Sequence, residues 1–311
     1  MMEDLLKKLD QNYIVMVNKH INTGTSEYLG NKANRICRFC GKTRPEVNFK
    51  QTTHAIPEFT GNTNLFTYYE CSTCNQDFSI AESNMAEYMK LYHTMCQVPG
   101  KRGVPSFKPN MQQESRIDKG KTAMEIKSYD GDDFSFDMNE EKQSITIRGT
   151  RNYVPALVFK CLTKMAMSIM PEDEVVYFEN TLKWLRTDKK IPMQLYGYFT
   201  MYSGIYPFGW VTSSIFKRKD DHVDDVPYAI FLLAYSNFVY QIPIHFCEKD
   251  RELSKATMTA IPTPLDFESN VLKRQLIDFS SEEKVSKEPV EIVMSYGELK
   301  EIDLSSEEEM Q

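Results

Sequence analysis

The stretch of sequence from residue 54 to residue 75, HAIPEFTGNTNLFTYYECSTCN, ends in two cysteines separated by two residues, Cys71 and Cys74. A second pair with the same spacing, Cys37 and Cys40, lies upstream in CRFC. Two such pairs supply the four thiolates of a tetrahedral structural zinc site. We therefore predict that these four cysteines bind one Zn²⁺ ion. Four buried or redox-active cysteines are the alternative interpretation.

The segment between the two pairs is longer than the about 15–20 residues of a plain zinc ribbon. It contains His54, a turn at Gly61, and Asn64 just before apolar Leu65, and Asn75 follows the last cysteine. A strand with a histidine, a return strand and a helix that begins with an amide side chain can converge on one small cleft. We expect the zinc ion to hold the ends of this arrangement together.

These residues resemble the HNH endonuclease family, whose ββα-metal motif often lies between two Cys-x-x-Cys zinc knuckles. The similarity covers about residues 36–90 and rests on CRFCGK, HAIPEFTGN, NLF and YECSTCN, as in a bacterial subgroup with His-x-Ile-Pro and Glu-Cys-x-x-Cys-Asn signatures. In that family the first histidine is the general base, the middle asparagine orients it, and the last signature residue helps to bind the catalytic metal. The resemblance implies these catalytic roles for His54, Asn64 and Asn75 in turn.

The resemblance also implies a catalytic divalent cation such as Mg²⁺. A histidine with an ordinary pKa of about 6.5 can deprotonate water near neutral pH, and a cation stabilises charge on the phosphate. Many family members place an acidic metal ligand directly before the histidine, whereas this chain has Thr53. The residues expected to bind the cation are His54, Asn75, Glu58 and Glu82, with Asn84 as a further oxygen donor.

The charge of the chain is unevenly distributed. The net charge is −7 over 311 residues, but residues 1–110 carry 13 Lys and Arg against 10 Asp and Glu. This N-terminal part can contact phosphates, although a solvated surface explains the same residues equally well. Its basic residues near the first cysteine pair and after the expected helix are Lys32, Arg35, Arg38, Lys42, Arg44, Lys50, Lys101, Arg102 and Lys108.

The sequence predicts an α+β fold with an antiparallel sheet in the second half. Apolar periodicity favours helices, and β-branched and aromatic runs favour strands. The expected helices cover residues 4–22, 76–98, 153–170 and 171–187, and the expected strands cover residues 47–49, 122–130, 133–138, 144–149, 194–202, 208–216, 228–236 and 238–246. We expect an HNH nuclease domain at 1–110, a target-selecting or regulatory α+β domain at 111–270, and an acidic tail at 271–311.

The sequence therefore favours a metal-dependent endonuclease that acts on DNA, with RNA not excluded and a homodimer or a regulatory protein as a further partner. Seven cysteines and no signal-like apolar segment indicate a reducing compartment, the cytoplasm, without membrane insertion. A role in defence against foreign DNA is an analogy with the family. A catalytically inactive zinc-knuckle binding module is the alternative. A zinc deaminase is excluded, because Ile56 and Glu70 occupy positions where its signature needs glutamate and proline.

Overall fold

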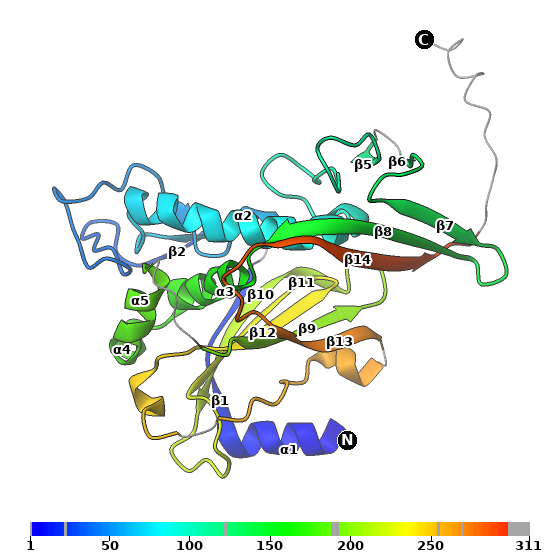
Figure 1. Ribbon diagram of the computed structural model, residues 1–311. Coiled ribbons are helices and arrows are strands. Elements are labelled where there is room, and N and C mark those ends of the chain that lie inside the picture. The colour runs from blue at the N-terminus through cyan, green and yellow to red at the C-terminus, as the bar shows by residue number, and fades with distance from the viewer. Residues whose placement is uncertain are drawn as a thin grey trace. The chain divides into compact units, whose positions relative to one another are not determined.

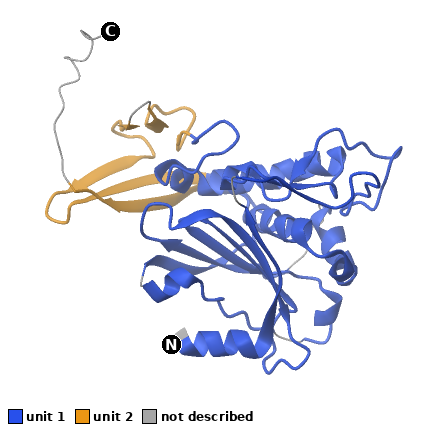
Figure 2. Cartoon of the chain, turned by 180° about the vertical axis from the view of Figure 1, so that it is seen from behind, with its two compact units in different colours: residues 1–105, 152–286 blue, residues 106–151, 287–311 orange. Residues whose placement is uncertain are grey.

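The structure is a computed structural model that describes residues 2–21, 24–120, 123–187, 193–253, 256–268 and 270–297. It is a mixed α+β fold, as the sequence predicts, and the chain divides into two compact units. The first unit comprises residues 1–105 and 152–286, and the second comprises residues 106–151 and 287–311 (Figure 2). Each unit is described separately below.

The centre of the first unit is an antiparallel sheet of six strands, in the order β1-β10-β11-β12-β9-β13 (Figure 1). The strands are β1 (Tyr13–Ile21), β9 (Tyr196–Tyr202), β10 (Phe208–Arg218), β11 (Ala229–Ser236), β12 (Phe238–Pro243) and β13 (Val271–Asp278). Every residue of β11 and β12 is buried. A strand that is covered on both faces has no polar face, so it reads as a continuous apolar run instead of an alternating one.

Helices cover both faces of this sheet (Figure 1). On one face α2 (Ser72–Met95) packs against α3 (Pro155–Ile169), which also contacts β10, β11 and β12. On the other face Leu9 of α1 (Met2–Asn12) packs against a buried cluster that includes Ile230 and Leu232. After α3 the chain forms α4 (Glu172–Val175), η2 (Val176–Phe178) and α5 (Glu179–Leu185), and later η3 (Glu248–Asp250) and η4 (Pro264–Glu268).

The N-terminal segment differs from the expected helix over residues 4–22. The helix ends at Asn12, and Tyr13–Ile21 form β1, which pairs antiparallel with β10 from Tyr13↔Arg218 to Ile21↔Val211. The Asn12 side chain accepts hydrogen bonds from the backbone N–H groups of Val223 and Asp224. The β-branched residues after Asn12 favour a strand. A short apolar run fits both the helical and the strand periodicity, and the pairing with β10 makes this segment a strand.

The segment with the two cysteine pairs contains little regular structure. A small sheet joins β2 (Glu27–Leu29), β4 (Leu65–Thr67) and β3 (Thr53–His54), with β3 antiparallel to β4, and η1 (Glu58–Thr60) follows β3. The strand expected at residues 47–49 is instead irregular chain, whose Val47 and Phe49 side chains are buried. Burial of these two side chains accounts for the alternation that suggested a strand.

The second unit contains a sheet in the order β14-β8-β7 and a β5-β6 pair. Its strands are β5 (Arg116–Lys119), β6 (Met124–Lys127), β7 (Ser135–Asn139), β8 (Ser144–Tyr153) and β14 (Val285–Ser295). Phe107, Ile117 and Ile147 are buried in it. A Cβ atom on Gly149 would lie 2.7 Å from the ring of Phe107, so this strand position needs glycine.

The division of the chain differs from the one expected. The first unit ends near the predicted boundary, at residue 105, but the chain returns to it at residue 152, because β9 to β13 form one sheet with β1. Residues 271–295 of the expected acidic tail include β13 and β14. In β14 exposed Glu291 lies between buried Val290 and Ile292, so the acidic composition concealed a strand period. Residues 298–311 lie outside the described residues.

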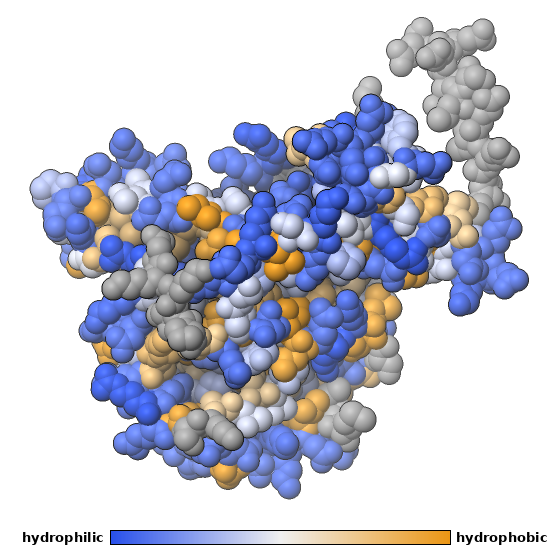
Figure 3. All heavy atoms as spheres, viewed as in Figure 1, coloured by the Kyte–Doolittle hydropathy of each residue, from blue (hydrophilic) through white to orange (hydrophobic). Residues whose placement is uncertain are grey.

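Hydrophilic residues predominate on the face drawn in Figure 3, and apolar residues appear there as separate small patches. Scattered apolar side chains of this kind are normal on a folded surface. None of the helices in the described ranges is both long and apolar enough to cross a membrane.

Candidate active site

The four cysteines of the two pairs meet at the start of α2. Their Sγ atoms all lie within 4.8 Å of one another, and the Sγ atoms of Cys40 and Cys71 are 3.9 Å apart. A tetrahedral zinc ion with Zn–S bonds of about 2.3 Å separates its sulfur ligands by about 3.8 Å. The cluster therefore fits a structural zinc ion, as the spacing of the cysteines predicts.

The surroundings of the cluster favour a thiolate at Cys37, whereas burial raises the pKa of Cys71 to about 11 and the hydrogen bond with Cys37 raises the pKa of Cys74. The backbone N–H of Cys71 donates to the Sγ of Cys37, and the N–H of Cys74 donates to the Sγ of Cys71, both at 3.4 Å. Hydrogen bonding from the Cys74 side chain lowers the pKa of Cys37 to about 5, although burial opposes this. A group that is deprotonated at neutral pH binds a metal ion without first losing a proton.

His54 lies at the end of β3, opposite Phe66 of β4. The two ring centroids are 4.5 Å apart, and the Nε2 atom of His54 lies 3.6 Å from an oxygen of Glu58. The side chain is 21% exposed. Burial lowers the pKa of His54 below its ordinary value, and Glu58 opposes this change. The imidazole is therefore neutral at pH 7 and can accept a proton, as a general base must.

A residue that the sequence analysis missed, Asn62, contacts the imidazole. Its side chain is fully buried, its Nδ2 atom lies 3.5 Å from the Nδ1 atom of His54, and it donates to the carbonyls of Ile56 and Leu65 at 2.5 and 3.1 Å. Because these carbonyls use both amide hydrogens of Asn62, its side chain packs against the His54 ring without donating a hydrogen bond to it. The Gly61-Asn62 dipeptide, with Gly61 at φ 91°, was the available signal, since it is typical of a turn.

The two predicted asparagines lie nearby in the chain. Asn64 is half-buried in the turn that Asn62 organises, and its backbone N–H donates to the Asn62 side chain at 3.0 Å. Asn75 is half-buried in the first turn of α2, where its backbone N–H donates to the Cys71 carbonyl. In the described part of the chain no hydrogen bond joins Asn75 to His54. The roles expected for Asn64 and Asn75 remain predictions.

The family model described as HNH endonuclease matches residues 37–82. Residues 37–82 form an HNH endonuclease domain. The match begins at the first zinc-cluster cysteine and ends at Glu82 in α2, so it contains both cysteine pairs, His54 and Glu58. Searches of the curated proteins and of the solved structures found no match.

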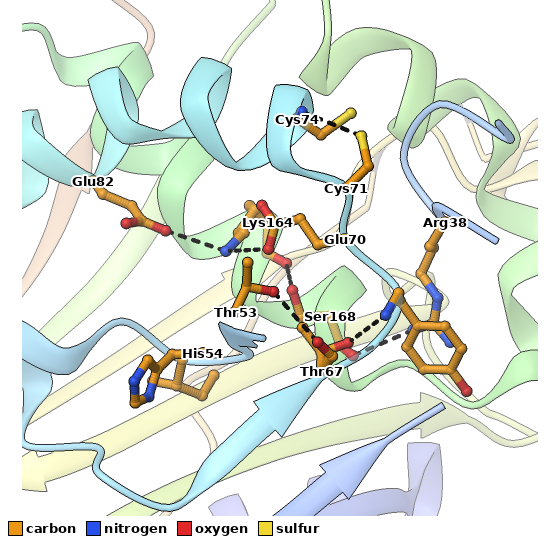
Figure 4. A network of polar contacts seen from close by, with 12 residues as sticks. Arg38, Thr53, His54, Thr67, Glu70, Cys71, Cys74, Glu82, Lys164 and Ser168 are labelled. Carbon is orange, nitrogen blue, oxygen red and sulfur yellow. Dashed lines mark hydrogen bonds and ion pairs between the residues drawn. The ribbon is translucent and has the colours of Figure 1, made fainter. Parts of the chain in front are cut away.

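Glu82 of the HNH domain, an expected metal ligand, forms an ion pair that sequence reasoning did not find. Its Oε1 atom lies 3.1 Å from Nζ of Lys164, in α3, and Glu70 lies at the same distance from that nitrogen (Figure 4). Glu82 and Lys164 both influence the pKa of His54, in opposite directions. Nothing in the sequence around Lys164, which lies in an almost entirely apolar helix, indicates this contact.

Asn84, the further oxygen donor, has a different role from the one expected. Its Oδ1 atom accepts a hydrogen bond of 2.8 Å from the backbone N–H of Val154, at the start of α3, and its Nδ2 atom donates to Ile80. The first N–H groups of a helix lack partners within the helix. Asn84 therefore caps α3, and its oxygen is directed at the backbone.

Arg38 of the HNH domain, one of the basic residues that could contact phosphates, instead binds groups of the protein itself. Its guanidinium donates to the carbonyls of Met167 and Met170, at the end of α3, at 2.6 and 2.8 Å. It lies over the ring of Tyr69, 3.8 Å from the centroid, and Tyr69 donates to Glu172. Since the last carbonyls of a helix lack partners within it and attract cations, Arg38 caps α3 at the opposite end from Asn84.

A cavity of about 900 Å³ lies elsewhere in the first unit. It is lined by β9, by Leu276 of β13 and by residues between 243 and 258. None of the cysteines of the cluster, His54 or Lys164 lines it. The candidate active site of the HNH domain thus lies outside this cavity.

Proposed function

We propose that this protein is a metal-dependent endonuclease that hydrolyses phosphodiester bonds of DNA, with His54 as the general base. The observation that supports this most strongly is the partly exposed imidazole with a lowered pKa in the part of the chain that matches the HNH endonuclease model. A neutral imidazole in contact with solvent is the group that water deprotonation at pH 7 requires.

The residues around His54 support that role. Phe66 packs against one side of the ring and Asn62 lies against Nδ1, so the ring is held in one orientation. When His54 accepts a proton from water it becomes an imidazolium, which the Glu58 carboxylate, 3.6 Å from Nε2, stabilises. We propose that Asn64 orients this site through the turn that carries Asn62.

We propose that a hard divalent cation such as Mg²⁺ assists the reaction. His54 and Glu58 lie 3.6 Å apart, and in the described ranges no third acidic, cysteine or histidine side chain lies within 4.8 Å of both. Glu82 and Asn75 are proposed as further ligands. Mg²⁺ keeps several waters and needs only one or two carboxylates. Such a cation would stabilise the charge that develops on the phosphate and on the leaving oxygen.

We further propose that DNA is the substrate, with RNA as the alternative. Residues beyond the HNH domain would select the target or regulate cleavage. A partner protein or a second copy of the chain would assist binding. An acidic chain attracts phosphates weakly, since non-specific binding depends on Lys and Arg. A cytoplasmic role against foreign DNA fits these proposals.

The test is digestion of plasmid, linear DNA and RNA by the purified protein with Mg²⁺, Mn²⁺ or Ni²⁺. We expect metal-dependent cleavage of DNA that His54→Ala reduces by at least about 100-fold, the usual contribution of a general base, while the melting temperature and the zinc content are retained. His222→Ala is the matched control, because His222 is a half-buried residue outside the HNH domain whose ring bonds to the Asp224 carbonyl through Nδ1.

The second candidate function is an inactive zinc-containing binding module, which Thr53 in place of an acidic ligand favours. Intact DNA and RNA with every metal, together with retained binding, would support this module and contradict the nuclease.

A further inference from the structure

Lys164 is a buried cation that α3 inserts between two carboxylates of the HNH domain (Figure 4). Its side chain is 1% exposed, and its Nζ atom lies 3.1 Å from Glu70 and 3.1 Å from Glu82. Glu70 is fully buried, whereas the Glu82 side chain is 28% exposed. Of the three charged groups, only Glu82 therefore reaches the surface to a significant extent.

The negative charge of this group belongs on Glu82. Burial by itself would lower the pKa of Lys164, but Glu70 and Glu82 outweigh this effect and raise it above the ordinary value, so the amine stays charged. Burial raises the pKa of Glu70, which favours its protonated form. Because a charge is least costly where water reaches it, the partly exposed Glu82 is the carboxylate that pairs with the Lys164 ammonium as an ion.

The position of Lys164 is fixed from both ends of α3. Asn84 caps the first turn through Val154, and Arg38 binds the carbonyls of Met167 and Met170 at the last turn. The helix cannot slide or rotate against the HNH domain without breaking one of these caps. The Nζ atom of Lys164 is therefore held at a defined place relative to α2.

We propose that Lys164 is a positioning residue that holds the Glu82 carboxylate of the HNH domain in place as a ligand for a divalent cation, so that α3 completes the active site of this domain. This rests on the proposed function. Lys164 takes one oxygen of Glu82, which leaves the other oxygen for the cation. Partners of this kind orient a ligand and raise its affinity for metal, and their loss typically costs about 10–100-fold in metal affinity.

The competing explanation is that Lys164 only neutralises Glu70. The two explanations separate in the double variant Lys164→Met/Glu70→Met, which replaces the buried ion pair with apolar side chains of similar length. Such replacements are often neutral for stability or stabilising. If Lys164 only neutralised Glu70, removal of both would leave metal binding unchanged. If it positions Glu82, the double variant binds metal more weakly although it folds.

The experiment is a titration of the zinc-loaded, full-length protein with Mn²⁺, followed by electron paramagnetic resonance. We expect the wild-type protein to bind one Mn²⁺ ion, and Lys164→Met/Glu70→Met to bind it at least about tenfold more weakly. Glu82→Gln is expected to have a similar effect, and adding it to the double variant is expected to change little, because both act on one carboxylate.

Two further variants keep the test decisive if the double variant does not fold. Glu70→Gln keeps the contact between Lys164 and Glu82, so we expect Mn²⁺ affinity close to that of the wild-type protein. Lys164→Arg keeps the charge but changes its position, and we expect weaker binding. Lys160→Met is the matched control, since Lys160 lies one turn earlier in α3 and donates to the Thr187 carbonyl.

The inference would be overturned if the double variant Lys164→Met/Glu70→Met bound Mn²⁺ as tightly as the wild-type protein, or if both Lys164→Arg and Glu82→Gln did so. Absence of Mn²⁺ binding by the wild-type protein would also overturn it. The proposed function fails in a different way. A wild-type protein that binds Mn²⁺ through Lys164 and Glu82 but cleaves no DNA or RNA would contradict the nuclease and leave the assignment of Lys164 in place.

Discussion

The zinc cluster and the His54 site lie in the same domain but are held by different means. The cluster takes all four ligands from two short segments, around Cys37 and Cys71, and could close around one ion. The site that we propose takes its imidazole from β3, Glu82 from α2 and Lys164 from α3. A closed set of identical ligands tolerates changes elsewhere in the fold, whereas a site assembled from three elements depends on each of them. The proposed catalysis would thus be open to control from the rest of the chain, and the zinc cluster would not.

The largest expected effect comes from breaking the cluster. Cys71→Ser should release zinc and unfold the HNH domain, because structural zinc contributes about 10–16 kcal/mol to folding in small zinc domains. Metal analysis and circular dichroism measure both outcomes. Cys96→Ser is the control, as Cys96 lies outside the cluster. A folded Cys71→Ser protein would show that packing, and not zinc, maintains the domain.

The second effect concerns His93 of α2, which is buried and hydrogen-bonded to the Tyr235 hydroxyl at 2.9 Å. Burial lowers its pKa to about 3. In the unfolded chain the pKa of this histidine is about 6.5, so the unfolded state binds more protons than the folded state between pH 6.5 and 3. The free energy of unfolding therefore falls by up to about 4 kcal/mol as the pH decreases across this range. Urea denaturation from pH 7 to pH 4 measures this change.

His93→Gln should flatten that dependence while keeping a partner for Tyr235. The zinc cluster also releases protons when it binds its ion, so the comparison with the wild-type protein must be made at equal zinc content. An equally steep loss of stability in His93→Gln would assign the acid sensitivity to the cluster instead of to α2.

A third, smaller effect is expected from Arg38→Leu, which removes the bonds to the end of α3 and the contact with Tyr69. We expect a loss of about 2–3 kcal/mol in the free energy of unfolding, since hydrogen bonds from charged groups contribute about 1.5–3 kcal/mol. DNA cleavage should also weaken, because α3 is released at one end. Thermal denaturation and plasmid digestion measure these effects, with exposed Arg44→Leu as the control. Unchanged cleavage would show that α3 needs only its Asn84 cap.

The smallest effect concerns the pKa of His54 in the metal-free protein. Burial lowers it, and Glu58 raises it. Glu58→Gln removes the opposing charge, so the pKa should fall further. Nuclear magnetic resonance titration of the His54 ring measures the shift directly. A shift to higher pKa would mean that Glu58 acts on His54 through burial and not through its charge.

The elements that could be predicted from sequence are those whose signal is local. The zinc cluster follows from the spacing of four cysteines, and β9 to β12 follow from aromatic and β-branched runs. The HNH endonuclease domain follows from residues 36–90 alone, and the family match at 37–82 confirms it. The segment after Asn12 was misassigned, because its strand identity comes from β10, which is distant in the sequence.

The sequence by itself determined which residues can bind zinc and which histidine belongs to the candidate site, because ligand type and spacing are properties of a short segment. Only the tertiary structure decided that Asn62 packs against His54, that Arg38 and Asn84 cap α3, and that Lys164 reaches Glu82. The physical reason is that a buried charge requires a partner of opposite charge. The residue that provides it can come from any part of the chain that the fold brings within about 3 Å.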